Sequence, residues 1–163
     1  MIVMGVDPST KCGIAVVSEK EILFTAEIEF KKLTGLPRAS AIVERILEIK
    51  AEWNPEKIMI EDMFVGHASS AITIIQIGTI IRYFLWQEDF PYHDVPPTFL
   101  KKWVCGTGNA KKEQIMMAVY KKWGHESATN NVADAIALAK MGVAGVIPVQ
   151  LVAKKLKTSL TNP

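Results

Sequence analysis

The sequence has little of what marks disulfide-rich, zinc-binding or membrane proteins. Its two cysteines, Cys12 and Cys105, form no C-x-x-C pair, and its three histidines fit no metal triad. The apolar stretch 71–85 contains Gln76 and Arg82 and is too short to span a bilayer. The N-terminal residues lack the basic segment and cleavage site of a signal peptide. We therefore expect a cytoplasmic protein with no membrane role.

The usual nucleotide-binding fingerprints are also missing. After the first apolar run the chain reads GVDPSTKCG, which is neither G-x-G-x-x-G nor a phosphate-binding P-loop. A length of 163 residues fits one domain and is too short for the duplicated fold of actin-like ATPases. These absences disfavour doubly wound nucleotide-binding proteins and ATPases.

Charge of each sign is concentrated in a different part of the chain. The formal net charge is only +2, but residues 1–100 carry nine basic and fourteen acidic side chains, whereas residues 101–163 carry ten and three. A nuclease needs both, because cations hold phosphates and carboxylates bind the metal that cuts them. Lysines that only keep the second part solvated explain the asymmetry equally well.

Apolar periodicity predicts alternating strands and helices. Short β-branched runs predict strands at residues 2–6, 13–18, 22–30, 57–61 and 92–95. Three- and four-residue spacing predicts helices at residues 40–53, 69–87, 98–104, 112–123 and 131–141. The first three strands follow one another through short turns and should pair antiparallel. This order predicts an α/β fold with an RNase H-like mixed central sheet flanked by helices.

Three acidic residues stand at the rim of the expected core. Asp7 follows the first strand, Glu61 ends the fourth, and Asp134 lies early in the last helix. Two hard divalent cations about 4 Å apart that flank a phosphodiester need oxygen ligands from several directions. Carboxylates on two strands and a facing helix supply them. Singly, each acid also has an ordinary explanation as a turn residue, a solvated strand end or a helix N-terminal charge.

Four blocks of sequence, in order, carry a resemblance to a known family. Residues 1–17 read MIVMGVDPSTKCGIAVV, residues 60–64 read IEDMF before a long helix, and residues 131–137 read NVADAIA. Residues 97–114 combine Lys101, a G-T-G turn, Ala110 and Lys112 in one register. Together these blocks resemble RuvC-type Holliday junction resolvases, which are crossover junction endodeoxyribonucleases, over most of residues 1–140. A small chain of this kind also resembles resolvases encoded by bacteriophages.

The resemblance implies a role for each acid. Asp7 is expected to bridge two metal ions, with Glu61 holding one and Asp134 the other. The implied cofactor is Mg²⁺, for which Mn²⁺ can substitute.

The resemblance also assigns residues to DNA. Lys101 and Lys112 are expected near the scissile phosphate, where a positive charge stabilises the transition state, and Lys112 is counted among the catalytic residues. Lys102 and Lys111 are expected to contact phosphates at the rim, although a solvated surface explains these two equally well. Phe64 is expected to stack on a base, which is worth about 1–3 kcal/mol.

Asn131 departs from the family pattern. The family presents two acids three positions apart in the last helix, and Asn131 stands where the first belongs, with Asn130 before it. Residues three apart share a helix face, so Asn131 should point where a carboxylate would point. Either three carboxylates suffice, or an aspartate at position 131 or 130 has been replaced; in the second case Asn131→Asp should raise cleavage.

The resemblance also implies a homodimer. The apolar residues of the helix expected at residues 69–87 run almost all the way round, which also fits a fully buried core helix. The resemblance implies instead that one face packs on the sheet and the other on a second copy. Two active sites related by that axis could cut two strands of a four-way junction or other branched DNA.

Three functions remain open from the sequence. The first is a dimeric, structure-selective DNA endonuclease, with residues 1–152 as one RNase H-like nuclease domain and residues 153–163 as a basic, flexible tail. The second is a junction-binding protein with weak or no catalysis. The third is an RNase H-like nuclease that acts on structured RNA.

Overall fold

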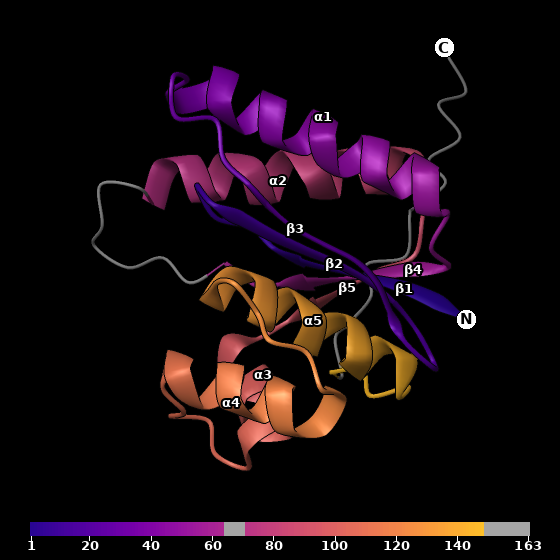
Figure 1. Ribbon diagram of the computed structural model, residues 1–163. Helices are drawn as coiled ribbons and strands as arrows, with labels where there is room; N and C mark the ends of the chain where they lie inside the picture. The colour runs from indigo at the N-terminus through magenta and orange to yellow at the C-terminus, as the bar shows by residue number, and fades with distance from the viewer. Residues whose placement is uncertain (64–70, 149–163) are drawn as a thin grey trace.

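A five-stranded sheet with helices on both faces forms the described part of the protein, residues 1–63 and 71–148 of the computed structural model (Figure 1). The strands are β1 (Ile2–Asp7), β2 (Cys12–Ser18), β3 (Ile22–Ile28), β4 (Lys57–Glu61) and β5 (Tyr92–Val95). The helices are α1 (Gly35–Trp53), α2 (Ala71–Gln87), α3 (Pro97–Cys105), α4 (Lys112–Trp123) and α5 (Asn130–Val143). Each element expected from the sequence is therefore present.

The sheet has the strand order β3-β2-β1-β4-β5. Strands β1, β2 and β3 pair antiparallel, whereas β4 is parallel to β1 and β5 is parallel to β4. Helices α1 and α2 cover one face of the sheet, and α3, α4 and α5 lie on the other (Figure 1). The prediction of a mixed central sheet flanked by helices is confirmed.

Helix α1 begins at Gly35, so the expected start at Ser40 was wrong by more than one turn. Pro37 lies in the first turn of the helix, where backbone N–H groups have no acceptor within the helix, so a proline is tolerated there. The helix ends at Trp53 and is capped by Asn54, which has a left-handed φ of 43° and donates its N–H to the Lys50 carbonyl.

Successive residues of the two central strands face opposite sides of the sheet. In β1, Val3 packs into the core beneath α5, whereas Met4 packs into the core beneath α1 and α2. The same alternation carries Asp7 to the α5 side. In β4, Met59 packs towards α5, so Glu61, two residues later, also faces α5. The strands thus deliver both acids to one face of the sheet.

Helix α5 lies directly against the backbones of β1 and β2 at Gly5 and Gly13, which have no side chains. A Cβ atom at Gly5 would lie 2.0 Å from the Ala135 carbonyl oxygen, and one at Gly13 would lie 2.0 Å from the Asn131 carbonyl oxygen. Thr129 caps the helix, its Oγ1 accepting a hydrogen bond from the Val132 N–H at 3.3 Å. This close approach brings the first turns of α5 next to the end of β1.

Helix α2 has a core face and an exposed apolar stripe. Ile77, Ile81 and Leu85 are completely buried against the sheet and α1. The opposite face exposes four large apolar side chains, namely Ile72 (69% exposed), Ile75 (36%), Tyr83 (54%) and Trp86 (45%). The apolar circumference expected from the sequence therefore divides into a packed half and an uncovered half.

Within residues 1–63 and 71–148, no helix is long and apolar enough to cross a membrane. The expected tail, residues 153–163, lies outside the described residues, and the domain boundary at residue 152 stays a prediction.

Replacing Gly5 by alanine should destabilise the protein by about 1–3 kcal/mol or more, because the new methyl group meets backbone atoms of α5 that cannot rotate away. Urea unfolding followed by circular dichroism measures the change. Gly108→Ala is the control, since its Cβ would lie 3.3 Å from the nearest atom, the Thr98 carbonyl oxygen. Equal stability of the two variants would contradict the close approach of α5.

Candidate active site

A cavity of about 710 Å³ opens where β1, β4 and the first turns of α5 meet. Its walls include side chains from α3, α4 and the turn after β1 as well. Six of the residues predicted from the sequence line it: Asp7, Glu61, Lys101, Lys112, Asn131 and Asp134. Residues more than 120 positions apart are thus neighbours, as a site built from strand ends and a facing helix requires.

The three predicted acids of this cavity come from three elements, and a fourth acid that lines it, Asp62, lies 4.0 Å from the guanidinium group of Arg82. Asp7 is the last residue of β1, Glu61 is the last residue of the parallel neighbour β4, and Asp134 lies in the second turn of α5. Asp7 is only 7% exposed and shares a hydrogen bond with Glu61. Two carboxyl groups that meet in this way need a proton or a cation between them.

Burial dominates the electrostatics of the three acids. It raises the pKa of Asp7 and of Glu61, and for Glu61 the negative charges of Asp7 and Asp134 raise it further. The pKa of Asp134 rises to about 7, first because of burial and then because of the charge of Asp7. The site is therefore short of positive charge.

One oxygen of this group lacks a partner. Asp134 Oδ1 is buried and has no hydrogen-bond partner among the described residues. The same residues contain no group of three or more His, Cys, Asp or Glu side chains drawn together as a finished metal centre. The carboxylates of Asp7, Glu61 and Asp134 nevertheless fit a hard divalent cation. All three supply oxygen ligands, and Asp134 Oδ1 has no hydrogen-bond partner among the described residues.

The four predicted lysines occupy two kinds of position. Lys101 and Lys112 line the cavity, and the charge of each lowers the pKa of Asp134. Lys102 and Lys111 are exposed and do not line it. The remaining predicted DNA-binding residue, Phe64, lies outside the described residues.

Arg82 of α2 binds the end of β4, a contact that was not predicted from the sequence. Its guanidinium group donates to Asp94 Oδ1 at 2.7 Å and to the backbone carbonyl of Glu61 at 3.2 Å. The side chain is only 13% exposed, so these contacts are shielded from solvent. An arginine inside an otherwise apolar helix was the signal that pointed to such a contact.

The contact of Glu27, in β3, with the site was also not predicted from the sequence. Its Oε2 accepts a hydrogen bond at 3.2 Å from Nδ2 of Asn131, which lines the cavity. The alternating sequence of the third strand was the available signal, because it places Glu27 on the face opposite Ile28.

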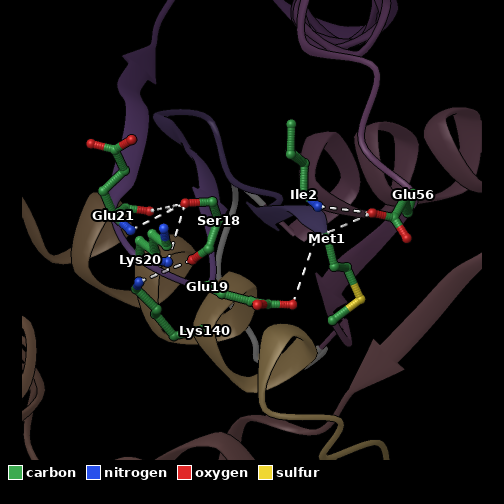
Figure 2. A network of polar contacts seen from close by, with 8 residues as sticks. All are labelled: Met1, Ile2, Ser18, Glu19, Lys20, Glu21, Glu56 and Lys140. Atoms are coloured by element: carbon green, nitrogen blue, oxygen red, sulfur yellow. Dashed lines mark hydrogen bonds and ion pairs between the residues drawn. The ribbon is translucent and has the colours of Figure 1, made fainter.

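A second cavity, of about 870 Å³, lies at the far end of the sheet and has a different character. Lys140 donates there to the Ser18 carbonyl at 3.3 Å, next to the turn between β2 and β3 (Figure 2). Nearby, the N-terminal amino group lies 3.6 Å from Glu19 and 3.5 Å from Glu56 (Figure 2). These carboxylates already have cationic partners, so this end of the sheet lacks the surplus of acids found at the first cavity.

The strand order and the acids at the ends of β1 and β4, faced by a third on α5, define an RNase H-like protein with a nuclease-type carboxylate site. Residues 3–141 match the family model described as crossover junction endodeoxyribonuclease RuvC. The chain belongs to the RuvC family. The expected bacteriophage origin stays a prediction.

Curated relatives and solved structures agree with this assignment. The RuvC endonuclease of Hydrogenovibrio crunogenus is 30% identical over 142 residues, which cover 83% of each chain. That of Chlorobium chlorochromatii is 31% identical over 153 residues, covering 85% of this chain and 77% of the relative. The structure of T. thermophilus RuvC in complex with Holliday junction substrate has a TM-score of 0.77 at 22% identity, covering 90% of this chain and 98% of that one. At this identity the structural likeness establishes the fold.

Membership in the RuvC family implies dependence on a divalent metal, which agrees with the donor set of the cavity. The structure brings Asp7, Glu61 and Asp134 together, while their individual roles stay predictions.

Asp134→Asn should stabilise the metal-free protein at pH 8, because it removes a charge whose burial is unfavourable. The folded-state pKa of about 7 lies well above the ordinary value of an aspartate, so the folded state binds the proton more tightly than the unfolded chain does. Stability of the metal-free wild type should thus rise as pH falls from 8 towards 5. The variant should lose the part of this dependence that Asp134 contributes, while Asp7 and Glu61, whose pKa values burial also raises, keep theirs. The expected increase in Tm at pH 8 is about 3–6 °C.

Differential scanning calorimetry in a chelating buffer measures this difference. Asp89→Asn is the control, because Asp89 is exposed and its left-handed φ of 53° suits asparagine. A lower Tm for Asp134→Asn than for the control would show that the carboxylate is stabilising.

Proposed function

We propose that this protein is a homodimeric, structure-selective endodeoxyribonuclease that resolves four-way (Holliday) or other branched DNA by Mg²⁺-dependent phosphodiester hydrolysis. The observation that carries the proposal is the convergence of Asp7, Glu61 and Asp134 in one cavity. Membership in the RuvC family supports the substrate class, because the curated relatives are crossover junction endodeoxyribonucleases.

The carboxylates act as the metal-binding group of the site. Asp7, which shares a hydrogen bond with Glu61, would contribute a ligand to both ions, and Glu61 and Asp134 would each hold one. Bound Mg²⁺ supplies positive charge to the phosphate oxygens and lowers the pKa of water. The rigid strand ends and the helix keep the three carboxylates in place before substrate binds, which reduces the reorganisation required during the reaction.

Lysines at the cavity hold the DNA backbone. Lys101 and Lys112 supply positive charge beside the carboxylates, where negative charge accumulates on the phosphate during cleavage. Lys102 and Lys111 lie on the exposed surface of the same region and bind neighbouring phosphates, adding affinity that falls with salt. Phe64 is proposed to stack on a base.

The exposed stripe of α2 is proposed as the dimer contact. Ile72, Ile75, Tyr83 and Trp86 recur at helical spacing and form one uncovered apolar face. A second copy of the same helix offers the same face, so an isologous contact buries both. Two sites related by the dimer axis can then cut two strands of one junction.

Purified protein incubated with a labelled four-way junction, the matching linear duplex and a structured RNA, with and without Mg²⁺, tests the function. We expect cleavage of the junction only with Mg²⁺. Tight binding without cleavage would identify a junction-binding protein, and preferential cleavage of RNA would identify an RNA nuclease; either result contradicts the proposal.

Asp7→Asn should reduce the rate of junction cleavage at least about 100-fold while junction binding stays equal or becomes tighter. The substitution removes a metal ligand and a negative charge that faces phosphate. Single-turnover cleavage and gel-shift titration measure the two effects, with Asp89→Asn again as control. Loss of binding together with cleavage would point to a structural role for Asp7.

Ile72→Glu combined with Tyr83→Glu should convert the dimer to a folded monomer, because both side chains belong to the exposed stripe and neither contributes to the core. Sedimentation at micromolar concentration measures the mass. Leu36→Glu is the control, as Leu36 is an equally exposed apolar residue (57%) on α1. Ile77 and Ile81 are unsuitable targets, because charging them would disrupt the core. A wild-type protein that sediments as a single chain would remove the dimer from the proposal.

A further inference from the structure

The side-chain NH₂ group of Asn131 donates to two oxygen acceptors. Its Nδ2 donates to the backbone carbonyl of Lys11 at 2.7 Å and to Glu27 Oε2 at 3.2 Å. An NH₂ group has two hydrogens, and each acceptor takes one. An ionised aspartate at position 131 has none to give and would place its charge against a carbonyl oxygen and a second carboxylate. The surroundings of residue 131 therefore favour an amide.

Sheet register explains why Glu27 lies near the cavity. Asp7 of β1 pairs with Gly13 of β2, and Gly13 pairs with Glu27 of β3, so the three residues form one row across the sheet. Side chains of one row point to the same face, and neighbouring strands lie about 4.8 Å apart, which places the backbones of Asp7 and Glu27 roughly 10 Å from each other. Both acids face α5.

Gly13, in the middle of the row, provides the space that Asn131 occupies. A Cβ atom at Gly13 would lie 2.0 Å from the Asn131 backbone oxygen, so the first turn of α5 rests directly on this position. Asn131 thus stands between the two acids of the row and reaches Glu27 with its amide. The charge of Glu27 also acts at Asp7: it adds to burial, the largest cause, in raising the pKa of that carboxyl.

We propose that Glu27 is a further negative charge that acts on the active site from outside the cavity wall and that Asn131 is the positioning residue that holds it there. Glu27 acts through space on the cation held by Asp7 and Asp134, without being a ligand. Asn131 ties the turn after Asp7, through the Lys11 carbonyl, to the helix that carries Asp134. This inference rests on the proposed function, and it favours a native asparagine at position 131 over a replaced aspartate.

Glu27→Gln is the direct test of the charge. It preserves the shape of the side chain and removes the charge, so binding of Mg²⁺ or Mn²⁺, measured by calorimetric titration at low salt without DNA, should weaken about threefold to tenfold. Glu29→Gln is the matched control. Glu29 is a neighbouring glutamate whose charge is already paired with Lys11 at 3.8 Å and Lys31 at 3.7 Å, and its variant should bind within about twofold of wild type.

Asn131→Asp tests the positioning role. This variant should lower the Tm of the metal-free protein and should not accelerate junction cleavage. Adding Glu27→Gln should restore most of the lost Tm, because the amide introduced at position 27 can donate a hydrogen bond to the carboxylate introduced at position 131. If the two residues acted independently, the losses in Tm of the two single variants would add in the double variant. The proposed pair predicts instead that the double variant recovers most of the Tm lost by Asn131→Asp.

The outcomes separate this inference from the proposed function. If wild type binds the cation and cuts the junction, but Glu27→Gln binds the cation as tightly as Glu29→Gln, the charge role of Glu27 is wrong while the function stands. If Asn131→Asp binds the cation more tightly and cuts faster, Asn131 is a lost ligand and its positioning role is wrong. If wild type neither binds a divalent cation nor cuts branched DNA, the proposed function fails and the inference fails with it.

Discussion

The close approach of α5 to the sheet is the constraint on which the rest of the structure depends. Gly5 and Gly13 let the helix backbone rest on β1 and β2 where any Cβ atom would meet a carbonyl oxygen at 2.0 Å. Because α5 carries Asp134 while β1 ends at Asp7, this contact sets the separation of the two acids. The site is therefore held by main-chain packing, which varies little as side chains rotate.

That packing holds together groups that repel one another. Burial raises the pKa values of Asp7, Glu61 and Asp134, and the buried Oδ1 of Asp134 has no hydrogen-bond partner among the described residues. The apolar contacts beneath the site offset this unfavourable charge. Such a site is stabilised by whatever positive charge enters it, so binding of a cation and stability of the fold are thermodynamically linked.

The two faces of the sheet differ in composition and in proposed role. The face under α1 and α2 is a continuous apolar core, and beyond it α2 presents an uncovered stripe suited to a second copy of the chain. The opposite face combines apolar packing beneath α5 with the acidic cavity at the ends of β1 and β4. Arg82 links the two faces, because it projects from α2 and binds the carbonyl of Glu61.

The sequence by itself determined the elements, the mixed sheet and the acids at the strand ends, because two-residue and 3.6-residue periodicities are local properties of the chain. The G-T-G register and the final helix pointed to the RuvC family, and the family model agrees. Only the tertiary structure revealed the contacts of Glu27 and Arg82. Each contact depends on residues distant in sequence, and no local pattern encodes such pairings. Glu27 contacts Asn131, and Arg82 contacts Asp94 and the end of β4.

The role of Asn131 also depends on partners distant in sequence. From the sequence, either three carboxylates suffice beside a native Asn131, or Asn131 replaces an aspartate that bound the metal. In the structure its side chain meets two oxygen acceptors, which the sheet register and α5 bring together, and these favour the amide.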